Sequence, residues 1–183
     1  RQRQMCIRDR LTIEAIEHDI ADAFPACPTY RAWTSKMIIA KLKKRDGLTI
    51  HTVKEALEQM LLDGITDVIV QPTHVINGIE NDQMKADALS FRDRFSSIVF
   101  GNPLLTTEED NQAIVRVVAD EFRDMDPDTA LVLMGHGTEH YANTVYAALD
   151  YRFKDTGHKN IFLGTVEAYP ALDSLLRAAD SFH

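Results

Sequence analysis

Four short apolar runs, separated by segments of helical periodicity, constrain the fold of this chain more than any other feature of its sequence. The runs cover residues 67–71, 97–100, 130–134 and 160–164. Between and after them, apolar residues recur at the spacing of a helix, over residues 79–95, 107–125, 139–153 and from residue 171 onward. Strands that alternate with helices form a parallel sheet with helices on both faces. The sequence therefore predicts an α/β fold.

Three further helices are predicted before the first of these strands. The first covers residues 10–24, and the second is capped by Thr34 or Ser35 and ends at an Asp-Gly pair. Thr52 and Glu55 have the spacing of a capping box and open the third.

The two ends of the sequence do not fit a complete α/β domain. Residues 1–10 are too charged to fill a sheet interior, so we expect them to be a non-native segment standing where a first strand belongs. The polar turn before residue 130 is the expected lobe boundary. We therefore expect an N-terminal α/β lobe over residues 11–127 that lacks its first strand, and an incomplete second lobe over residues 128–183.

Composition excludes several functional classes. The formal net charge of −8 argues against a nucleic-acid partner, and the two cysteines, Cys6 and Cys27, form neither a disulfide framework nor a thiolate metal motif. No run is long enough to cross a membrane, and no secretory signal is present. A cytoplasmic location is expected, with a periplasmic one open if a native leader is missing from the sequence. Phosphate-binding glycine motifs are absent, so no nucleotide and no organic cofactor is expected.

Histidine and glutamate residues follow three of the predicted strands. His74, His136 and Glu167 come where ligands bind in open parallel sheets, beyond the carboxyl ends of the strands. Imidazole and carboxylate suit first-row divalent metals, and a histidine can also accept a proton. Gly135 and Gly137 flank His136 and would let a bulky ligand approach closely. A metal or proton-transfer site is therefore predicted around His136.

A second pair of candidates shares one loop. His74 is followed by an Asn-Gly turn and then by Glu80, so an imidazole and a carboxylate lie within a few residues of each other. Ordinary turn chemistry and a glutamate at a helix start explain the same pattern. Both readings stay open on the residues alone.

Several motifs in order resemble the anaerobic, ATP-independent (class II) sirohydrochlorin cobalt chelatases of cobalamin biosynthesis. They occupy residues 32–39 with 45–47, 73–78 with Glu80, 103–105, 134–137 (Met-Gly-His-Gly) and 164–170 (Gly-Thr-Val-Glu-Ala-Tyr-Pro). The resemblance implies a chelatase-like α/β fold of two lobes, each with a parallel sheet flanked by helices, and a cleft that holds the macrocycle. It further implies that His136 and Glu167 are metal ligands. The family's later histidine ligand and its first strand with a Ser-Phe-Gly-Thr-like turn are absent from this sequence, so the fold is expected to be truncated at both ends.

The resemblance implies a lyase that inserts Co(II), as substrate metal, into sirohydrochlorin or precorrin-2. We expect His74 and Glu80 to remove protons or to position the substrate, since His136 cannot hold the ion and accept a proton with the same nitrogen. The cations nearest to the matched motifs, which could bind the carboxylates of the macrocycle or could be solvated helix charges, are Arg31, Lys36 and Arg45.

Alternatives remain at this point. A non-catalytic carrier of metal or tetrapyrrole would use the same cleft, nickel and iron chelatases share the motifs, and the chain by itself could be inactive. The oligomeric state, a homo-oligomer included, is left open by the sequence.

Overall fold

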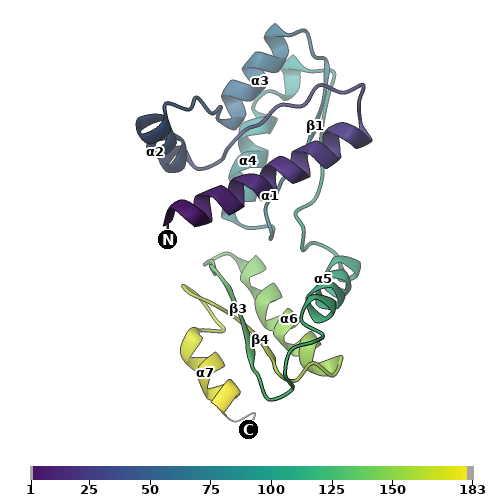
Figure 1. The fold of residues 1–183 in the computed structure, drawn as a ribbon. Coiled ribbons are helices and arrows are strands. Elements are labelled where there is room, and N and C mark those ends of the chain that lie inside the picture. The colour runs from purple at the N-terminus through teal and green to yellow at the C-terminus, as the bar shows by residue number, and fades with distance from the viewer. Residues whose placement is uncertain (1, 181–183) are drawn as a thin grey trace. The chain divides into compact units, whose positions relative to one another are not determined.

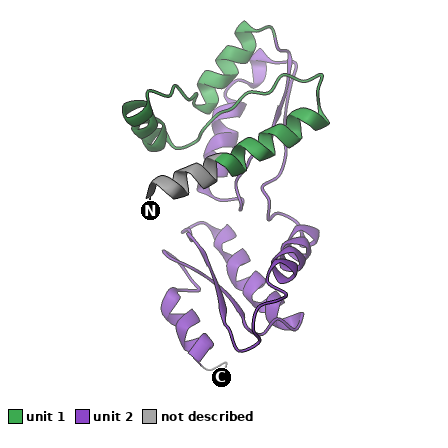
Figure 2. Cartoon of the chain, viewed as in Figure 1, with its two compact units in different colours: residues 1–64 green, residues 65–183 purple. Residues whose placement is uncertain are grey.

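The computed structural model describes residues 2–180, with side chains from residue 11 onward (Figure 1). The chain divides into two compact units, residues 1–64 and residues 65–183 (Figure 2). This division reflects the density of contacts within each unit. The predicted lobe boundary between residues 127 and 128 stays a prediction.

Unit 1 is helical and contains α1 (Gln2–Ala23), α2 (Lys36–Asp46) and α3 (Val53–Leu62). The side chain of Ser35 accepts a hydrogen bond from the backbone of α2, so Ser35, rather than Thr34, is the cap. The backbone N–H of Thr52 donates to Glu55 Oε2 at 2.7 Å, which confirms the predicted capping box of α3. The predicted start of the first helix at residue 10 is wrong, because α1 already begins at Gln2.

The first part of unit 2 is a strand–helix–strand unit. It contains β1 (Asp67–Val70), α4 (Ile79–Leu89), a 3-10 turn η1 (Arg92–Arg94) and β2 (Ser97–Phe100). The strands β1 and β2 pair in parallel, with Val68 opposite Ile98. The helix predicted over residues 79–95 is shorter in the structure, because α4 ends at Leu89 and residues near the predicted end form the 3-10 turn η1.

The rest of unit 2 repeats this arrangement. It contains α5 (Glu108–Glu121), β3 (Leu131–Gly135), a 3-10 turn η2 (Tyr141–Asn143), α6 (Thr144–Asp155), β4 (Ile161–Thr165) and α7 (Leu172–Asp180). β3 and β4 pair in parallel along their whole length. The helix predicted to reach residue 125 ends at Glu121, and the one predicted from residue 139 begins with the turn η2.

The two helices beside β4 cover opposite faces of the β3–β4 sheet. A Cβ at Gly135 would lie 2.3 Å from the Tyr146 ring on α6, and one at Gly164 would lie 2.3 Å from Leu175 on α7. Gly135 pairs with Thr165, the neighbour of Gly164 in sequence, so the two glycines point to opposite faces. Figure 1 shows β3 and β4 between α6 and α7. All five residues of β4 are buried as a result.

The main core of unit 2 joins α5, α6 and the β3–β4 sheet. Its buried residues are Leu105, Val115, Tyr146, Leu149, Phe153, Ile161 and Leu163. Leu105 comes from the loop after β2 and extends this core toward the first strand pair. None of the helices in the described part of the chain is long and apolar enough to cross a membrane.

Candidate functional site

The loops that follow β3 and β4 run side by side at the carboxyl edge of their sheet. Beyond the last strand residues, the N–H of Val166 donates to the carbonyl of Gly135 and that of Glu167 donates to the carbonyl of His136, both at 3.0 Å. The parallel pairing therefore continues into the two loops. It places His136 and Glu167 next to each other, at the edge where open parallel sheets bind ligands.

The side chain of His136 has one nitrogen engaged and the other available. Its Nδ1 lies 3.0 Å from the carbonyl oxygen of Gly137 and 3.8 Å from Glu167 Oε2. A carbonyl only accepts hydrogen bonds, so Nδ1 carries a proton and, in the neutral ring, Nε2 carries the lone pair. The side chains of His136 and Glu167 are 78% and 66% exposed, so both can turn toward an incoming ion.

The surroundings of His136 favour its protonated form. The hydrogen bond to the Gly137 carbonyl raises the pKa of His136, and the negative charges of Glu167 and, more weakly, Glu80 raise it further. A metal ion must displace the proton from Nε2 before it can bind. Glu80 influences this pKa through space, so the first turn of α4 and the loop after β3 contribute to one electrostatic environment.

The glycines around His136 have packing roles. Gly137 has a φ of +83°, and a Cβ there would lie 2.9 Å from the backbone nitrogen of Ala168. Gly135 faces the ring of Tyr146. These glycines were predicted to let the backbone turn sharply and to let a bulky ligand approach. The positive φ of Gly137 fits the predicted turn, and its close contact with Ala168 shows that it also lets the His136 loop pack against the Glu167 loop.

Asn143 connects these two loops and was not identified from the sequence. Its Oδ1 accepts a hydrogen bond from the N–H of Thr138 at 3.0 Å, and its Nδ2 donates to the carbonyl of Tyr169 at 2.6 Å. Thr138 follows the Gly-His-Gly motif and Tyr169 follows Glu167 by two residues. Asn143 thus holds together the two segments that carry the predicted metal ligands.

His74 lies in a different environment. It is half-buried in the loop after β1, where the N–H of Leu104 donates to its carbonyl oxygen at 3.0 Å. Burial lowers the pKa of His74, and the nearby Glu80 and Asn81 oppose this effect only in part. Its Nδ1 has no hydrogen-bond partner among the described residues. His74 is therefore set up to stay neutral, and a neutral imidazole can accept a proton.

Glu80 is exposed in the first turn of α4. Its carboxylate raises the pKa of both His74 and His136. The structure thus gathers the four residues predicted to handle metal and protons around the loops of unit 2. Their chemical roles stay predictions.

The described residues do not form a closed metal cage. Among them, no group of three or more His, Cys, Asp or Glu side chains is arranged to hold an ion. His136 and Glu167 are the two predicted metal ligands, and they lie beside each other in the described part of the chain.

The predicted cations lie in unit 1. Arg31 Nε donates to Glu17 Oε1 at 2.5 Å, and Arg45 Nε donates to Asp46 at 2.9 Å. Lys36 is the first residue of α2. Arg31 and Arg45 are therefore already paired with carboxylates of the protein. That the three cations bind the carboxylates of the macrocycle stays a prediction.

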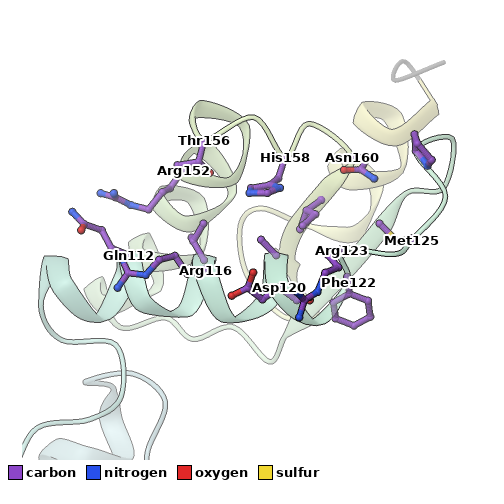
Figure 3. Close-up of a pocket in the computed structure, with 14 residues that line it drawn as sticks. Gln112, Arg116, Asp120, Phe122, Arg123, Met125, Arg152, Thr156, His158 and Asn160 are labelled. Carbon is purple, nitrogen blue, oxygen red and sulfur yellow. The ribbon is translucent and has the colours of Figure 1, made fainter.

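A pocket of about 830 Å³ lies elsewhere in unit 2 (Figure 3). Its wall includes Arg116 and Asp120 from α5, and His158 and Asn160 from the segment before β4. It therefore opens at the amino-terminal edge of the β3–β4 sheet, opposite the edge that carries His136. None of the predicted site residues lines it.

The chain matches a family of known proteins over almost its whole length. Residues 8–181 match the family described as cobalt chelatase (CbiK). The sirohydrochlorin cobaltochelatase of Salmonella typhimurium is 34% identical over 164 residues, which are 90% of this chain and 62% of that protein. The sirohydrochlorin cobaltochelatase CbiKC of Nitratidesulfovibrio vulgaris is 31% identical over 172 residues, which are 90% of this chain and 59% of that protein. The chain thus spans about three fifths of the length of these curated relatives.

Proposed function

The chain belongs to the cobalt chelatase (CbiK) family, and on this premise we propose that the protein is a sirohydrochlorin cobaltochelatase, a lyase of cobalamin biosynthesis that inserts Co(II) without ATP. The observation that carries the proposal is the pairing of His136 and Glu167 at the carboxyl edge of the β3–β4 sheet, with Nε2 of His136 free. Nitrogen and carboxylate oxygen donors suit Co(II). The substrates would be the metal ion and sirohydrochlorin, or its precursor precorrin-2.

Insertion exchanges one divalent ion for the two protons on the pyrrole nitrogens of the macrocycle. His136 and Glu167 would hold Co(II) together with water, and four ring nitrogens would replace these ligands in turn. A chelatase must release the ion to the macrocycle, so its protein ligands have to bind the ion only moderately.

The two released protons need acceptors that are not already metal ligands. His74 is held in its neutral form by burial, and Glu80 is an exposed carboxylate in the same loop region. A neutral imidazole and a carboxylate are both groups that serve as general bases in enzymes. We therefore assign proton removal to these two residues, while Arg31, Lys36 and Arg45 are candidates for binding the carboxylates of the macrocycle.

The test is Co(II) insertion by the purified protein, followed by the change in macrocycle absorbance. We expect His136→Ala to lower the rate by about 100-fold or more, because the loss of a residue that only supports a metal ligand already costs about 10- to 100-fold. His158→Ala, which removes a histidine at the opposite edge of the sheet, is the matched control and should leave the rate unchanged.

Three outcomes would change the proposal. Equal rates for His136→Ala and the wild type would exclude the assigned site. Stoichiometric binding of metal or macrocycle without insertion would make the protein a carrier. Faster insertion of Ni(II) or Fe(II) than of Co(II), in a panel of metals at equal free concentration, would change the metal.

A further inference from the structure

A second histidine of the Gly-His-Gly loop contacts helix α4, although the two segments are far apart in the sequence. His140 Nε2 lies 3.3 Å from Asp82 Oδ2. The side chain of His140 is only 14% exposed, whereas that of Asp82 is 57% exposed. Neither residue was singled out for a role in the chemistry proposed above.

The hydrogen bonds of His140 define the direction of this contact. Its Nδ1 accepts a hydrogen bond from the backbone N–H of Ala142 at 3.2 Å, so Nδ1 carries no proton. The ring proton is therefore on Nε2, the nitrogen that lies nearest to Asp82. The contact is a polar one between the imidazole of His140 and the carboxylate of Asp82, at 3.3 Å.

Both partners are close in sequence to residues of the proposed site. Asp82 follows Glu80 by two residues in the first turn of α4. His140 lies in the loop after His136, and its backbone N–H donates to Thr138 Oγ1 at 3.2 Å. Thr138 is in turn held by Asn143, which also binds the Glu167 loop. The contact between His140 and Asp82, followed by these hydrogen bonds, thus links α4 to the loops that carry His136 and Glu167.

We propose that Asp82 and His140 are positioning residues, whose side-chain contact holds helix α4 with Glu80 against the loop that carries His136. This inference rests on the proposed function, because it explains how the group that holds the ion and the group that takes a proton stay at a fixed separation. Neither residue touches metal or substrate in this assignment. A shift of about 1 Å between reacting groups can lower a rate by about 100-fold, so a contact outside the chemistry can matter for turnover.

Two substitutions of His140 separate the contact with Asp82 from the rest of the side chain. His140→Gln places an N–H donor near the position of Nε2 and so keeps a polar contact with Asp82. His140→Asn places an acceptor near Nδ1, which keeps the hydrogen bond from Ala142 but loses the contact with Asp82. The pair His18 and Asp22 on α1 is a matched control, because its atoms lie 3.5 Å apart and both of its side chains are more than 70% exposed.

The first experiment does not depend on activity. Amide hydrogen exchange over residues 136–143 should be about tenfold faster in Asp82→Ala and His140→Asn than in the wild type, and near the wild-type rate in His140→Gln and Asp22→Ala. In the double variant Asp82→Ala/His140→Asn, exchange should be no faster than in the single ones, since both remove the same contact. Unchanged exchange in Asp82→Ala and His140→Asn would overturn the inference, whether or not the protein inserts cobalt.

The second experiment uses the insertion assay. Asp82→Ala and His140→Asn should lower kcat about tenfold, with little change in the Kd for Co(II), and His140→Gln should recover most of the loss. Equal loss in His140→Gln and His140→Asn would contradict the positioning role. A wild-type protein without insertion activity would refute the proposed function, while the exchange experiment would still decide whether the contact holds the loop.

Discussion

His136 can present Nε2 to a metal ion because its other ring nitrogen has a fixed partner. The carbonyl of Gly137 accepts the proton of Nδ1 and defines the tautomer, and Glu167 adds a negative charge 3.8 Å from the same nitrogen. Partners of this kind orient a metal-binding histidine and raise its basicity. They also raise the pKa of His136, so protons compete more strongly with the ion. Binding of Co(II) should therefore strengthen as the pH rises through this pKa.

Replacing Glu167 by glutamine should lower the pKa of His136. The substitution removes one of the charges that stabilise the imidazolium and leaves the larger effect, the hydrogen bond to Gly137, in place. An NMR titration of the His136 ring in metal-free protein measures the change. Glu139→Gln, at an exposed glutamate in the same loop, is the control. Because Glu167 is exposed, the difference in the His136 pKa between the wild type and Glu167→Gln should shrink at high salt. An unchanged His136 pKa in Glu167→Gln would contradict the electrostatic explanation.

Gly135 is needed because Tyr146 occupies the space of a side chain at that position. A Cβ there would lie 2.3 Å from the Tyr146 ring, which is held in the core of unit 2. We expect Gly135→Ala to lower the free energy of unfolding by about 1–3 kcal/mol, the usual cost of overpacking. Urea unfolding followed by circular dichroism measures it. Gly78→Ala is the control, since its Cβ would meet no atom nearer than 3.6 Å, and an equal effect at both positions would contradict this explanation.

At the scale of elements, sequence patterns predicted the starts of α2, α3 and α5 but not the ends of α4 and α5. The beginnings of α2, α3 and α5 have side-chain caps that depend on residues close in the sequence. The predicted ends of α4 and α5 were too late. Phe91 and Phe95 are buried and continue the apolar period of α4, although the chain has already turned into η1. A periodicity rule cannot separate a helix from a turn that buries its side chains at the same spacing.

The cap of α5 should contribute measurably to stability. Thr107 accepts a hydrogen bond from the N–H of Asp110, and Asp110 Oδ2 accepts one from the N–H of Thr107 at 2.8 Å. We expect Thr107→Ala to lower the free energy of unfolding by about 1 kcal/mol, because the hydroxyl half of this capping box is lost. Thr107→Ser keeps the hydroxyl and should stay close to the wild type in the same urea experiment. A similar loss in both variants would mean that the methyl group, and not the cap, is responsible.

At the scale of the whole molecule, the contacts that assemble the site come from distant parts of the sequence. The strand pattern was enough to predict that His136 and Glu167 follow strands of one parallel sheet, and hence that they lie at the same edge. It could not predict Asn143, which joins the two loops, or the contact between Asp82 and His140. These residues have ordinary types for turns and helix starts, so only the folded chain shows their partners.

The stability of the whole molecule in acid should depend on a small set of exposed carboxylates. Hydrogen bonds from the Thr52 backbone and hydroxyl lower the pKa of Glu55, those from Ser97 and Thr66 lower the pKa of Asp67, and those from Thr107 and Thr106 lower the pKa of Asp110. Each of these pKa values is lower in the folded chain than in the unfolded chain, where it is 4.5 for Glu and 3.8 for Asp. The stabilising effect is therefore complete above the unfolded pKa values. It is lost as the pH falls through the folded pKa values.

This linkage predicts how the free energy of unfolding changes with pH. Lowering the pH from 7 toward the isoelectric point near 5.3 reduces the repulsion from a net charge of −8, which favours the folded state. Below about pH 4.5 the three carboxylates are protonated more readily in the unfolded chain, so the free energy of unfolding should fall.

The triple variant Glu55→Gln/Asp67→Asn/Asp110→Asn tests this prediction. Its amide oxygens can still accept hydrogen bonds but do not titrate, so its free energy of unfolding should fall less steeply with acid. Urea unfolding at pH 7, 5 and 3 measures both slopes, and the variant Glu58→Gln/Asp93→Asn/Asp124→Asn controls for the change in net charge. Equal slopes for the two triple variants would show that net charge alone, and not the hydrogen-bonded carboxylates, determines the acid sensitivity.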